Sequence, residues 1–501
     1  MRTFIAAGVA ALVCTACFGP PVSTPATRVT QESPIFVPPP ANKVDILFMV
    51  DNSLSMDAMQ AELRARFGSF LSVFDGLAAN GIYPDLHIGV VTSDYGAGDK
   101  AKAGGCDASP GGQRGLLQAI GGAASGCSGP SGAPFIKYAY SDTGPTDNLP
   151  SGQSLAETFT CMATVGSRGC GFEHQLESVY AALTNVSENA GFLRDDAILA
   201  VVFVTNEDDG SAPPTAKIYE DDVALGGTHG AYDTFRQTRY GIACGSPLAE
   251  PPYAASMGPL VGCEPAPDLA GEMIGEEYDV SRYTTLFTQP KKRGGIKRDP
   301  MQQVILVGLD GPAMPVEVVT VRASSGSGVP PDVGYVNCSP VDGTSCVVRV
   351  QHVCQNAVQP AFFADPGVRL HSVITSAMNN VEASICGDDI TRAPDFSGVL
   401  QKVADAIGRS LRPACVPALL SDSEHPDCVV EDVTVDDNGN DQITEIPRCD
   451  LAMGRFPCWR IEDKAACKDL SPQSLGVTID RNGMDPPADA AQRVFCSTVA
   501  N

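Results

Sequence analysis

Three oxygen-bearing side chains at alternate positions, Asp51, Ser53 and Ser55, are the residues of this sequence best suited to chemistry. They follow an apolar run, residues 44–50, and precede a segment with helical character, residues 56–63. Such an apolar run is typical of a parallel strand covered on both faces. Carboxylate and hydroxyl oxygens at its end suit a hard cation, Mg²⁺ or else Mn²⁺ or Ca²⁺. The simpler alternative is a helix N-cap formed by one of the serines.

The elements that must position these oxygens alternate between strands and helices. Further strands are predicted at 86–93, 196–205, 303–309 and 369–375, and helices at 173–183 and 396–411. This alternation predicts an α/β fold with a doubly wound, mostly parallel sheet. Ligands of such sheets bind where the strands end, which is where Asp51 lies.

The Asp-x-Ser-x-Ser motif after a Val-rich strand resembles the metal-ion-dependent adhesion site of von Willebrand factor type A domains. The resemblance implies a Rossmann-like fold in which both serines bind the metal directly and Asp51 acts through water. It also implies a threonine and a second aspartate from later loops, and a partner protein that donates an Asp or Glu carboxylate. It covers the strands and helices of residues 43–412, but not the insertions or the C-terminal part.

The loop before the 173–183 helix should supply the residue in the threonine role. Ser167 is the predicted residue, with Thr164 and Glu173 as rivals. The alternative for this stretch is a plain Gly-rich turn.

In this family the second aspartate usually stands in a Thr-Asp-Gly motif at the end of a later strand. The corresponding residues here are Thr205-Asn206-Glu207-Asp208-Asp209. Asn206 occupies the aspartate position, so one negative charge is missing. An Asn oxygen can still bind a hard cation, and Glu207 or Asp208 are the alternative ligands. A solvated acidic turn is the simpler interpretation.

Other acidic residues favour structural roles. Asp94 and Asp310 follow strands, where turn formation accounts for them. Residues 436–441 resemble half of a calcium loop, but the glycine is misplaced, so a polar hairpin turn is predicted.

Catalytic motifs of the serine hydrolase, zinc protease and phosphate-loop types are absent from the sequence, and the six histidines are scattered. We therefore predict a binding protein and not an enzyme. The alternatives are a metal-dependent hydrolase using Asp51 and the acids at 207–209, and a structural envelope protein with a degenerate metal site.

Residues 1–17 have the charged start and short apolar core of a signal peptide. Small residues before Cys17 resemble a bacterial lipoprotein processing site, with Cys17 as the lipid-bearing residue; a site shifted to Cys14 is the alternative. We expect a lipid-anchored protein at the outer membrane or surface of a Gram-negative bacterium, or else a secreted one. The N-terminal lipid would be its only membrane contact. A net charge of −25 argues against nucleic acid as a partner and against binding to an anionic surface by charge.

The remaining cysteines predict disulfides. Of 18 cysteines, 16 remain after Cys14 and Cys17 are set aside, an even number. Pairs 106–127, 161–170 and 244–263 are plausible, although sequence does not fix the connectivity. The expected organisation is a Pro/Ser/Thr-rich linker at 18–42, an α/β domain at 43–412 with disulfide-pinned insertions, and a Cys-rich domain at 413–501.

Overall fold

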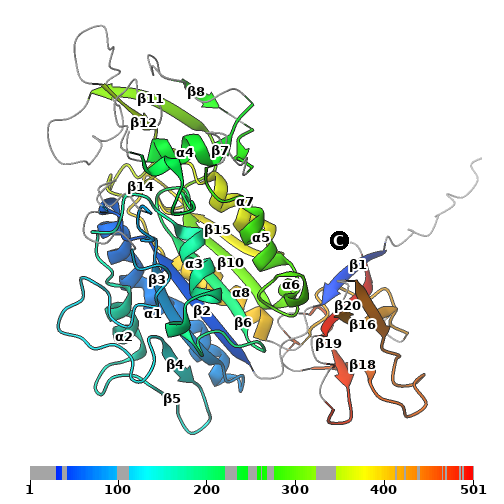
Figure 1. The fold of residues 1–501 in the computed structure, drawn as a ribbon. Coiled ribbons are helices and arrows are strands. Elements are labelled where there is room, and N and C mark those ends of the chain that lie inside the picture. The colour runs from blue at the N-terminus through cyan, green and yellow to red at the C-terminus, as the bar shows by residue number, and fades with distance from the viewer. Residues whose placement is uncertain are drawn as a thin grey trace, which may run out of the picture.

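A seven-stranded sheet forms the centre of the larger domain (Figure 1). The computed structural model describes residues 30–35, 42–98, 106, 112–220, 234–245, 257–260, 262–267, 276–322, 346–411, 414–422, 425–436, 440–464, 467–468, 471–484, 487 and 490–499. The strand order is β15-β10-β6-β2-β3-β4-β5, and the first five of these strands are parallel. Their bounds are β2 Lys43–Val50, β3 Asp85–Thr92, β4 Ile136–Ala139, β5 Thr146–Asp147, β6 Ile198–Val204, β10 Val304–Asp310 and β15 Asn379–Ser384.

Both faces of this sheet are buried, because alternate residues of β2 point into two separate cores. Ile46 and Phe48 join the core under α1, α2 and α8, whereas Leu47 and Met49 join the core under α3, α5 and α7. The helices are α1 Asp57–Ala79, α2 Leu155–Ala163, α3 Gln175–Thr184, α5 Ser281–Thr288, α6 Pro300–Gln303, α7 Val368–Ser376 and α8 Ser397–Leu411. The predicted α/β fold with a mostly parallel sheet is confirmed.

One predicted strand was wrong. Residues 369–375 form helix α7, and the strand of that region is β15, which follows it. The Asp208 carboxylate accepts the backbone N–H groups of Arg369 and Leu370, which satisfies donors at the helix start. β15 lies at the sheet edge and carries polar residues, so its sequence lacks the apolar run of a central strand.

Smaller elements gather at the end of the sheet where the parallel strands finish. They include α4 Thr234–Gly241, whose Gln237 contacts Glu173, and the sheet β12-β11-β8 above it (Figure 1). The bounds are β7 Ile242–Ala243, β8 Met257–Leu260, β9 Glu264–Pro265, β11 Val316–Arg322, β12 Cys346–Val350, β13 Cys354–Gln355 and β14 Phe363–Ala364.

Seven disulfides are present among the described residues, and the predicted pair Cys244–Cys263 is one of them. The other two predicted pairs were wrong, because Cys106 bonds to Cys170 and Cys127 to Cys161. The loop after β3 runs beside the end of α2, where Gly121 donates a backbone hydrogen bond to the carbonyl of Cys161. The pairing of these four cysteines therefore follows contacts in the fold and not their proximity in sequence. The remaining bonds are Cys354–Cys386, Cys415–Cys467, Cys428–Cys496 and Cys449–Cys458.

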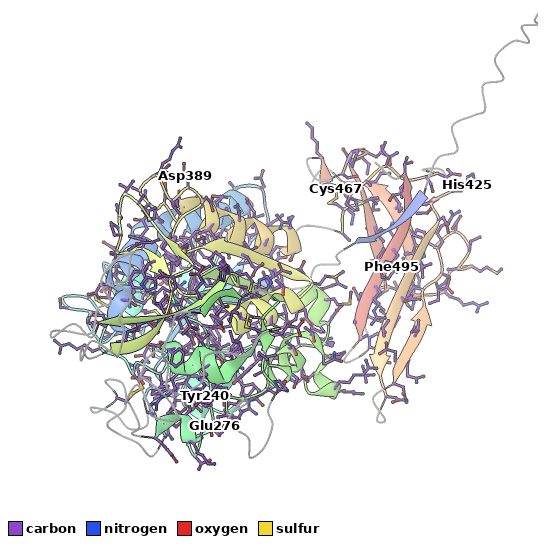
Figure 2. The ribbon with its side chains drawn as sticks, turned by 90° about the horizontal axis from the view of Figure 1, so that it is seen from above. Tyr240, Glu276, Asp389, His425, Cys467 and Phe495 are labelled. Carbon is purple, nitrogen blue, oxygen red and sulfur yellow. A yellow bond between two sulfur atoms is a disulfide. The ribbon has the colours of Figure 1, made fainter. Side chains whose placement is uncertain are left out.

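The C-terminal part is a separate β-structure with its own core (Figure 2). Its four-stranded sheet has the order β1-β20-β16-β17, and β18 pairs with β19. The bounds are β1 Thr30–Ile35, β16 Cys428–Val435, β17 Asp441–Glu445, β18 Cys458–Asp463, β19 Leu475–Asp480 and β20 Ala491–Val499. The antiparallel connection from β16 to β17 agrees with the predicted hairpin at 436–441.

The predicted linker at 18–42 is not a simple tether. Its residues 30–35 form β1, which extends the C-terminal sheet by pairing antiparallel with β20. The predicted signal peptide and Cys17 lie outside the described residues. Among the residues that are described, no helix has both the length and the hydropathy to cross a bilayer.

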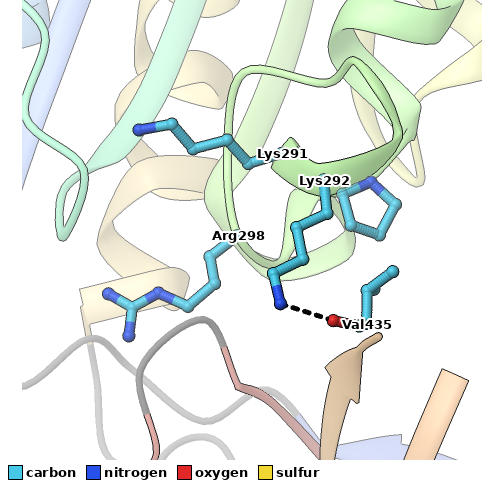
Figure 3. A pocket seen from close by; sticks show the side chains of 5 residues that line it. Lys291, Lys292, Arg298 and Val435 are labelled. Carbon is cyan, nitrogen blue, oxygen red and sulfur yellow. Dashed lines mark hydrogen bonds between the residues drawn. The ribbon is translucent and has the colours of Figure 1, made fainter. Parts of the chain in front are cut away.

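The two domains meet near α6, at the end of the sheet opposite to Asp51. Lys292 donates a hydrogen bond of 2.6 Å to the carbonyl of Val435 (Figure 3), and Arg293 pairs with Asp441. The C-terminal sheet therefore approaches the amino edge of the parallel sheet and leaves the carboxyl edge to the insertions.

Candidate functional site

Oxygen atoms from two neighbouring strands converge at the carboxyl edge of the sheet. Val50 and Val204 are register partners at the ends of β2 and β6, so the residues that follow them lie side by side. The hydroxyl oxygens of Ser53 and Ser55 are 3.3 Å apart, and the Ser55 hydroxyl donates to Asn206 Oδ1 at 3.0 Å. Ser55 therefore lies within hydrogen-bonding distance of two other predicted ligands, Ser53 and Asn206. We call Ser53, Ser55 and Asn206 the oxygen cluster.

Asp51 lies directly behind the oxygen cluster and is completely buried. Its Oδ1 accepts the Ser53 backbone N–H at 2.8 Å and the Ser93 hydroxyl at 2.9 Å, and its Oδ2 accepts the Thr205 hydroxyl at 2.7 Å. All three donors are neutral. Burial raises the pKa of Asp51, and these hydrogen bonds lower it in part.

The serines do not act as helix caps, which was the alternative interpretation. Ser53 makes no side-chain capping bond to the short 3-10 helix Leu54–Met56, and Met56 is the N-cap residue of α1. Their hydroxyl groups point instead to each other and to Asn206.

The loop that carries Ser167 lies against the same site. Gln60 of α1 donates from one amide nitrogen to the carbonyls of Asp51 and Gly166, both at 2.8 Å. This bridge joins the residue before Ser167 to the first residue of the motif. Ser167 is half-buried. Its loop contacts the backbone of Asp51 and Asn52, and no contact of the Ser167 side chain with the oxygen cluster is present among the described residues.

A second contact and two disulfides fix this loop. Gly169 donates its N–H to the carbonyl of Asn52 at 2.8 Å, and a Cβ at position 169 would lie 2.3 Å from the Asn52 side chain. Only glycine allows this close approach. The Cys127–Cys161 and Cys106–Cys170 bonds flank the loop on its two sides. The rival Thr164 instead donates to the carbonyl of Thr160, one turn back in α2.

Glu207 and the other rival, Glu173, form a buried acid pair next to Asp51. They share a side-chain hydrogen bond, and Gln237 donates to Glu173 at 3.1 Å. Burial, followed by the charge of Asp51, raises the pKa of Glu173 to about 8. Burial and the charge of Glu173 raise the pKa of Glu207 well above its ordinary value. One proton held between the two carboxyls lets both stay buried.

Asp208 faces away from the oxygen cluster. Its carboxylate accepts the Arg369 and Leu370 N–H groups of α7 at 3.0 and 3.1 Å, and burial raises its pKa to about 6. Asp209 pairs with the Arg369 guanidinium at 3.2 Å and accepts the N–H of Leu176. Of residues 206–209, only Asn206 and Glu207 therefore lie beside Asp51.

Ser93 and Thr205, which hold Asp51, were not identified from the sequence. Each directly follows a strand that flanks β2, and this position in the sequence is the signal that could have identified them as partners of Asp51. Two acidic residues at the same edge have other roles. Asp94 accepts the N–H of Gly96 within a turn, whereas Asp310 is buried at the end of β10.

The residues present fit a small hard cation, although they depart from a carboxylate cage. Among the described residues, no three His, Cys, Asp or Glu side chains are grouped to hold a metal. The available ligands are hydroxyl and amide oxygens, with one carboxylate behind them. Asn206 Nδ2 is buried without a hydrogen-bond partner in the described part of the chain. This unused group is a hydrogen-bond donor, so it suits an acceptor such as a ligand carboxylate and is not itself a ligand for a cation.

Comparisons with known proteins do not assign this chain to a family. No family model matches this chain, and no curated protein matches it.

Proposed function

We propose that this protein is a lipid-anchored, Mg²⁺-dependent adhesion protein whose larger domain is of the von Willebrand factor type A kind. The observation that carries the proposal is the state of Asp51. It is fully buried, and no Lys or Arg of the described residues pairs with it. Buried carboxylates are normally paired with a cation or coordinated to a metal. A divalent ion among the oxygens of Ser53, Ser55, Asn206 and Ser167 would provide that positive charge.

The proposed chemistry follows from neutral ligands around a divalent ion. Hydroxyl and amide oxygens leave most of the ion's charge uncompensated, and the nearby carboxyl groups are Asp51, the Glu173–Glu207 pair and Asp365, whose charge acts on Glu207. Such an ion retains affinity for a further anionic ligand. A carboxylate from an Asp or Glu of a partner protein is the ligand that the motif resemblance implies, and the hydroxyls of Ser53 and Ser55 would hold the ion from the protein side.

The surroundings of the oxygen cluster suit a partner that approaches from outside. Leu54, between the two serines, is 58% exposed, and Arg168, next to Ser167, is also exposed. An apolar side chain therefore lies within the motif, and a cation lies on the loop that contacts Asp51 and Asn52. Arg168 would attract an acidic partner to a chain with a net charge of −25.

The test is a Mg²⁺-dependent capture from envelope extracts, followed by mutation of the captured partner. Wild-type protein should retain a partner in Mg²⁺ and release it in EDTA, and Ser53→Ala/Ser55→Ala should retain none. Replacing one Asp or Glu of that partner should then abolish binding. A partner retained equally in EDTA contradicts the proposal. Turnover of an ester or phosphoester panel that requires Asp51 would favour the metal-dependent hydrolase instead.

A further inference from the structure

The C-terminal domain displays large apolar side chains on a small closed loop. The Cys449–Cys458 disulfide joins the ends of this loop, which connects β17 to β18. Leu451 is 68% exposed, Met453 86% and Phe456 40%. We call residues 449–458 the apolar loop. Three large apolar side chains on ten residues are an exposed patch of the kind that marks a binding surface.

The backbone of the apolar loop is held in place, so this exposure is built into the fold. Cys449 donates to the carbonyl of Trp459, and Trp459 donates to that of Pro447. Within the loop, Arg455 donates to the carbonyl of Ala452, whose side chain is buried. The rigid base directs the neighbouring side chains of Leu451 and Met453 to the outside.

Met453 occupies a position where stability would favour another residue. Its φ is +50°, in the left-handed region that favours Gly or Asn. A methionine there strains the backbone, and its side chain makes up for none of this by burial. A residue that is unfavourable in both respects points to a role outside the folded chain.

The charges of this segment identify the chemistry of the partner. Residues 448–460 contain three arginines and one aspartate, in a chain whose net charge is −25. Arg448 pairs with Asp450, and Arg460 pairs with Glu462 and Asp480. Arg455 is exposed and makes no ion pair within the described residues. Apolar side chains beside an exposed arginine are the composition of segments that enter the interface of an anionic bilayer.

The course of the chain places this domain near the predicted lipid. Twelve residues separate Cys17 from Thr30, the first residue of β1, so the two are at most about 47 Å apart. Thr30 pairs with Val499, beyond the Cys428 end of β16, whereas the Val435 end of β16 contacts the α/β domain. β17 also runs from its contact with the α/β domain towards the far end of the sheet before the apolar loop begins.

We propose that the apolar loop inserts into the surface of an anionic membrane, with Leu451, Met453 and Phe456 among the acyl chains and Arg455 at the phosphates. The lipid at Cys17, taken from the proposed function, brings the domain to the bilayer, and the loop then fixes its orientation. The oxygen cluster lies at the opposite edge of the α/β domain from the C-terminal sheet, so it would face away from the membrane.

Vesicle binding of the mature chain with Cys17→Ser, which carries no acyl group, tests this. Wild-type protein should partition onto phosphatidylethanolamine–phosphatidylglycerol vesicles (3:1), and Leu451→Ser/Met453→Ser/Phe456→Ser should bind at least about tenfold more weakly. Val358→Ser, in the α/β domain and 54% exposed, is the matched control and should bind like wild type. Trp459, the one tryptophan of the chain, should be quenched by brominated acyl chains in wild type only.

A second variant separates insertion from damage to the fold. Met453→Gly removes the side chain but suits the left-handed backbone, so its thermal midpoint should equal or exceed that of wild type while vesicle binding weakens. EDTA should leave vesicle binding unchanged, which distinguishes this proposal from the Mg²⁺ site. Absence of wild-type binding, or equal binding by the triple variant, would overturn the proposal.

Discussion

The two ends of strand β2 bury an aspartate in opposite ways. Asp45, near its start, accepts the Arg194 guanidinium at 2.7 Å and lies 3.7 Å from the ammonium of Lys297. Asp51, just past its end, is equally buried but receives only neutral donors. Cationic side chains thus pair with Asp45 at the amino edge of the sheet, whereas no Lys or Arg of the described residues pairs with Asp51 at the carboxyl edge.

Under the proposed function, this difference separates a structural carboxylate, Asp45, from a functional one, Asp51. At Asp45 the charge is neutralised within the fold, so the amino edge needs no ligand. At Asp51 the hydrogen bonds orient the carboxylate without supplying a positive charge, and burial raises the pKa values of the neighbouring Glu173 and Glu207. The proposed divalent cation would compensate the charge of Asp51; a bound proton, which burial favours, is the alternative.

Removing the cation at the amino edge should have the largest effect. Arg194→Met leaves Asp45 buried with a more distant lysine as its one cationic partner, and it deletes hydrogen bonds to the carbonyls of Val44 and Asp85. We expect the free energy of unfolding to fall by about 3–5 kcal/mol in urea denaturation. Lys291→Met, which breaks an exposed pair with Asp195, should cost less than about 1 kcal/mol. Similar losses in both variants would refute the contrast.

His174, at the carboxyl edge, should make the fold sensitive to acid. Burial lowers its pKa to about 4, whereas the unfolded chain takes up the proton near 6.5. The folded state keeps His174 neutral, so its contribution is complete above pH 6.5 and is lost as the pH falls towards 4. The change amounts to about 3 kcal/mol. Urea unfolding across this range should show a shallower pH dependence in His174→Gln; an unchanged slope would contradict the assignment.

Mg²⁺ should stabilise the wild-type fold, because it binds the folded state alone. At a concentration 100 times the Kd the expected gain is about 2.7 kcal/mol. Thermal unfolding with and without Mg²⁺ measures it. Ser53→Ala/Ser55→Ala should lose this gain, and Ser72→Ala, an exposed serine of α1 that bonds only to the carbonyl of Ser69, should keep it. A gain of equal size in the double variant would place the ion elsewhere.

Asp51→Asn should have the smallest effect on the metal-free protein. The change removes a buried charge that has no cation and keeps the shape of the side chain, so we expect a difference below about 1 kcal/mol in EDTA. Loss of several kcal/mol, as in Arg194→Met, would show that Asp51 is neutralised within the protein after all.

The sequence predicts the central elements well because they are extreme in composition. The apolar runs of β2, β6 and β10 and the amphipathic α8 follow directly from burial on one or both faces. Residues 369–375 were misassigned because Val368, Leu370, Val373 and Ile374 form a short apolar set that fits either a strand or a helix. The helix start is held by Asp208, which lies 161 residues from Arg369 in sequence, so local sequence patterns cannot reveal it.

The candidate site divides in the same way. Asp51, Ser53 and Ser55 stand close together in one motif, and Asn206 follows a clear strand, so both could be located. Ser93 and Thr205 are ordinary hydroxyl residues whose role depends on the lateral order of β3, β2 and β6. The exchange of partners among Cys106, Cys127, Cys161 and Cys170 depends on the path of a long loop, which local sequence does not determine.

The most direct test of the central claim is a Mn²⁺ titration followed by electron paramagnetic resonance, with competition by Mg²⁺. We expect one ion per wild-type chain, displaced by Mg²⁺, and none in Asp51→Asn or Ser53→Ala/Ser55→Ala under the same conditions. Binding that is unchanged in both variants, or no binding by folded wild-type protein, would contradict it.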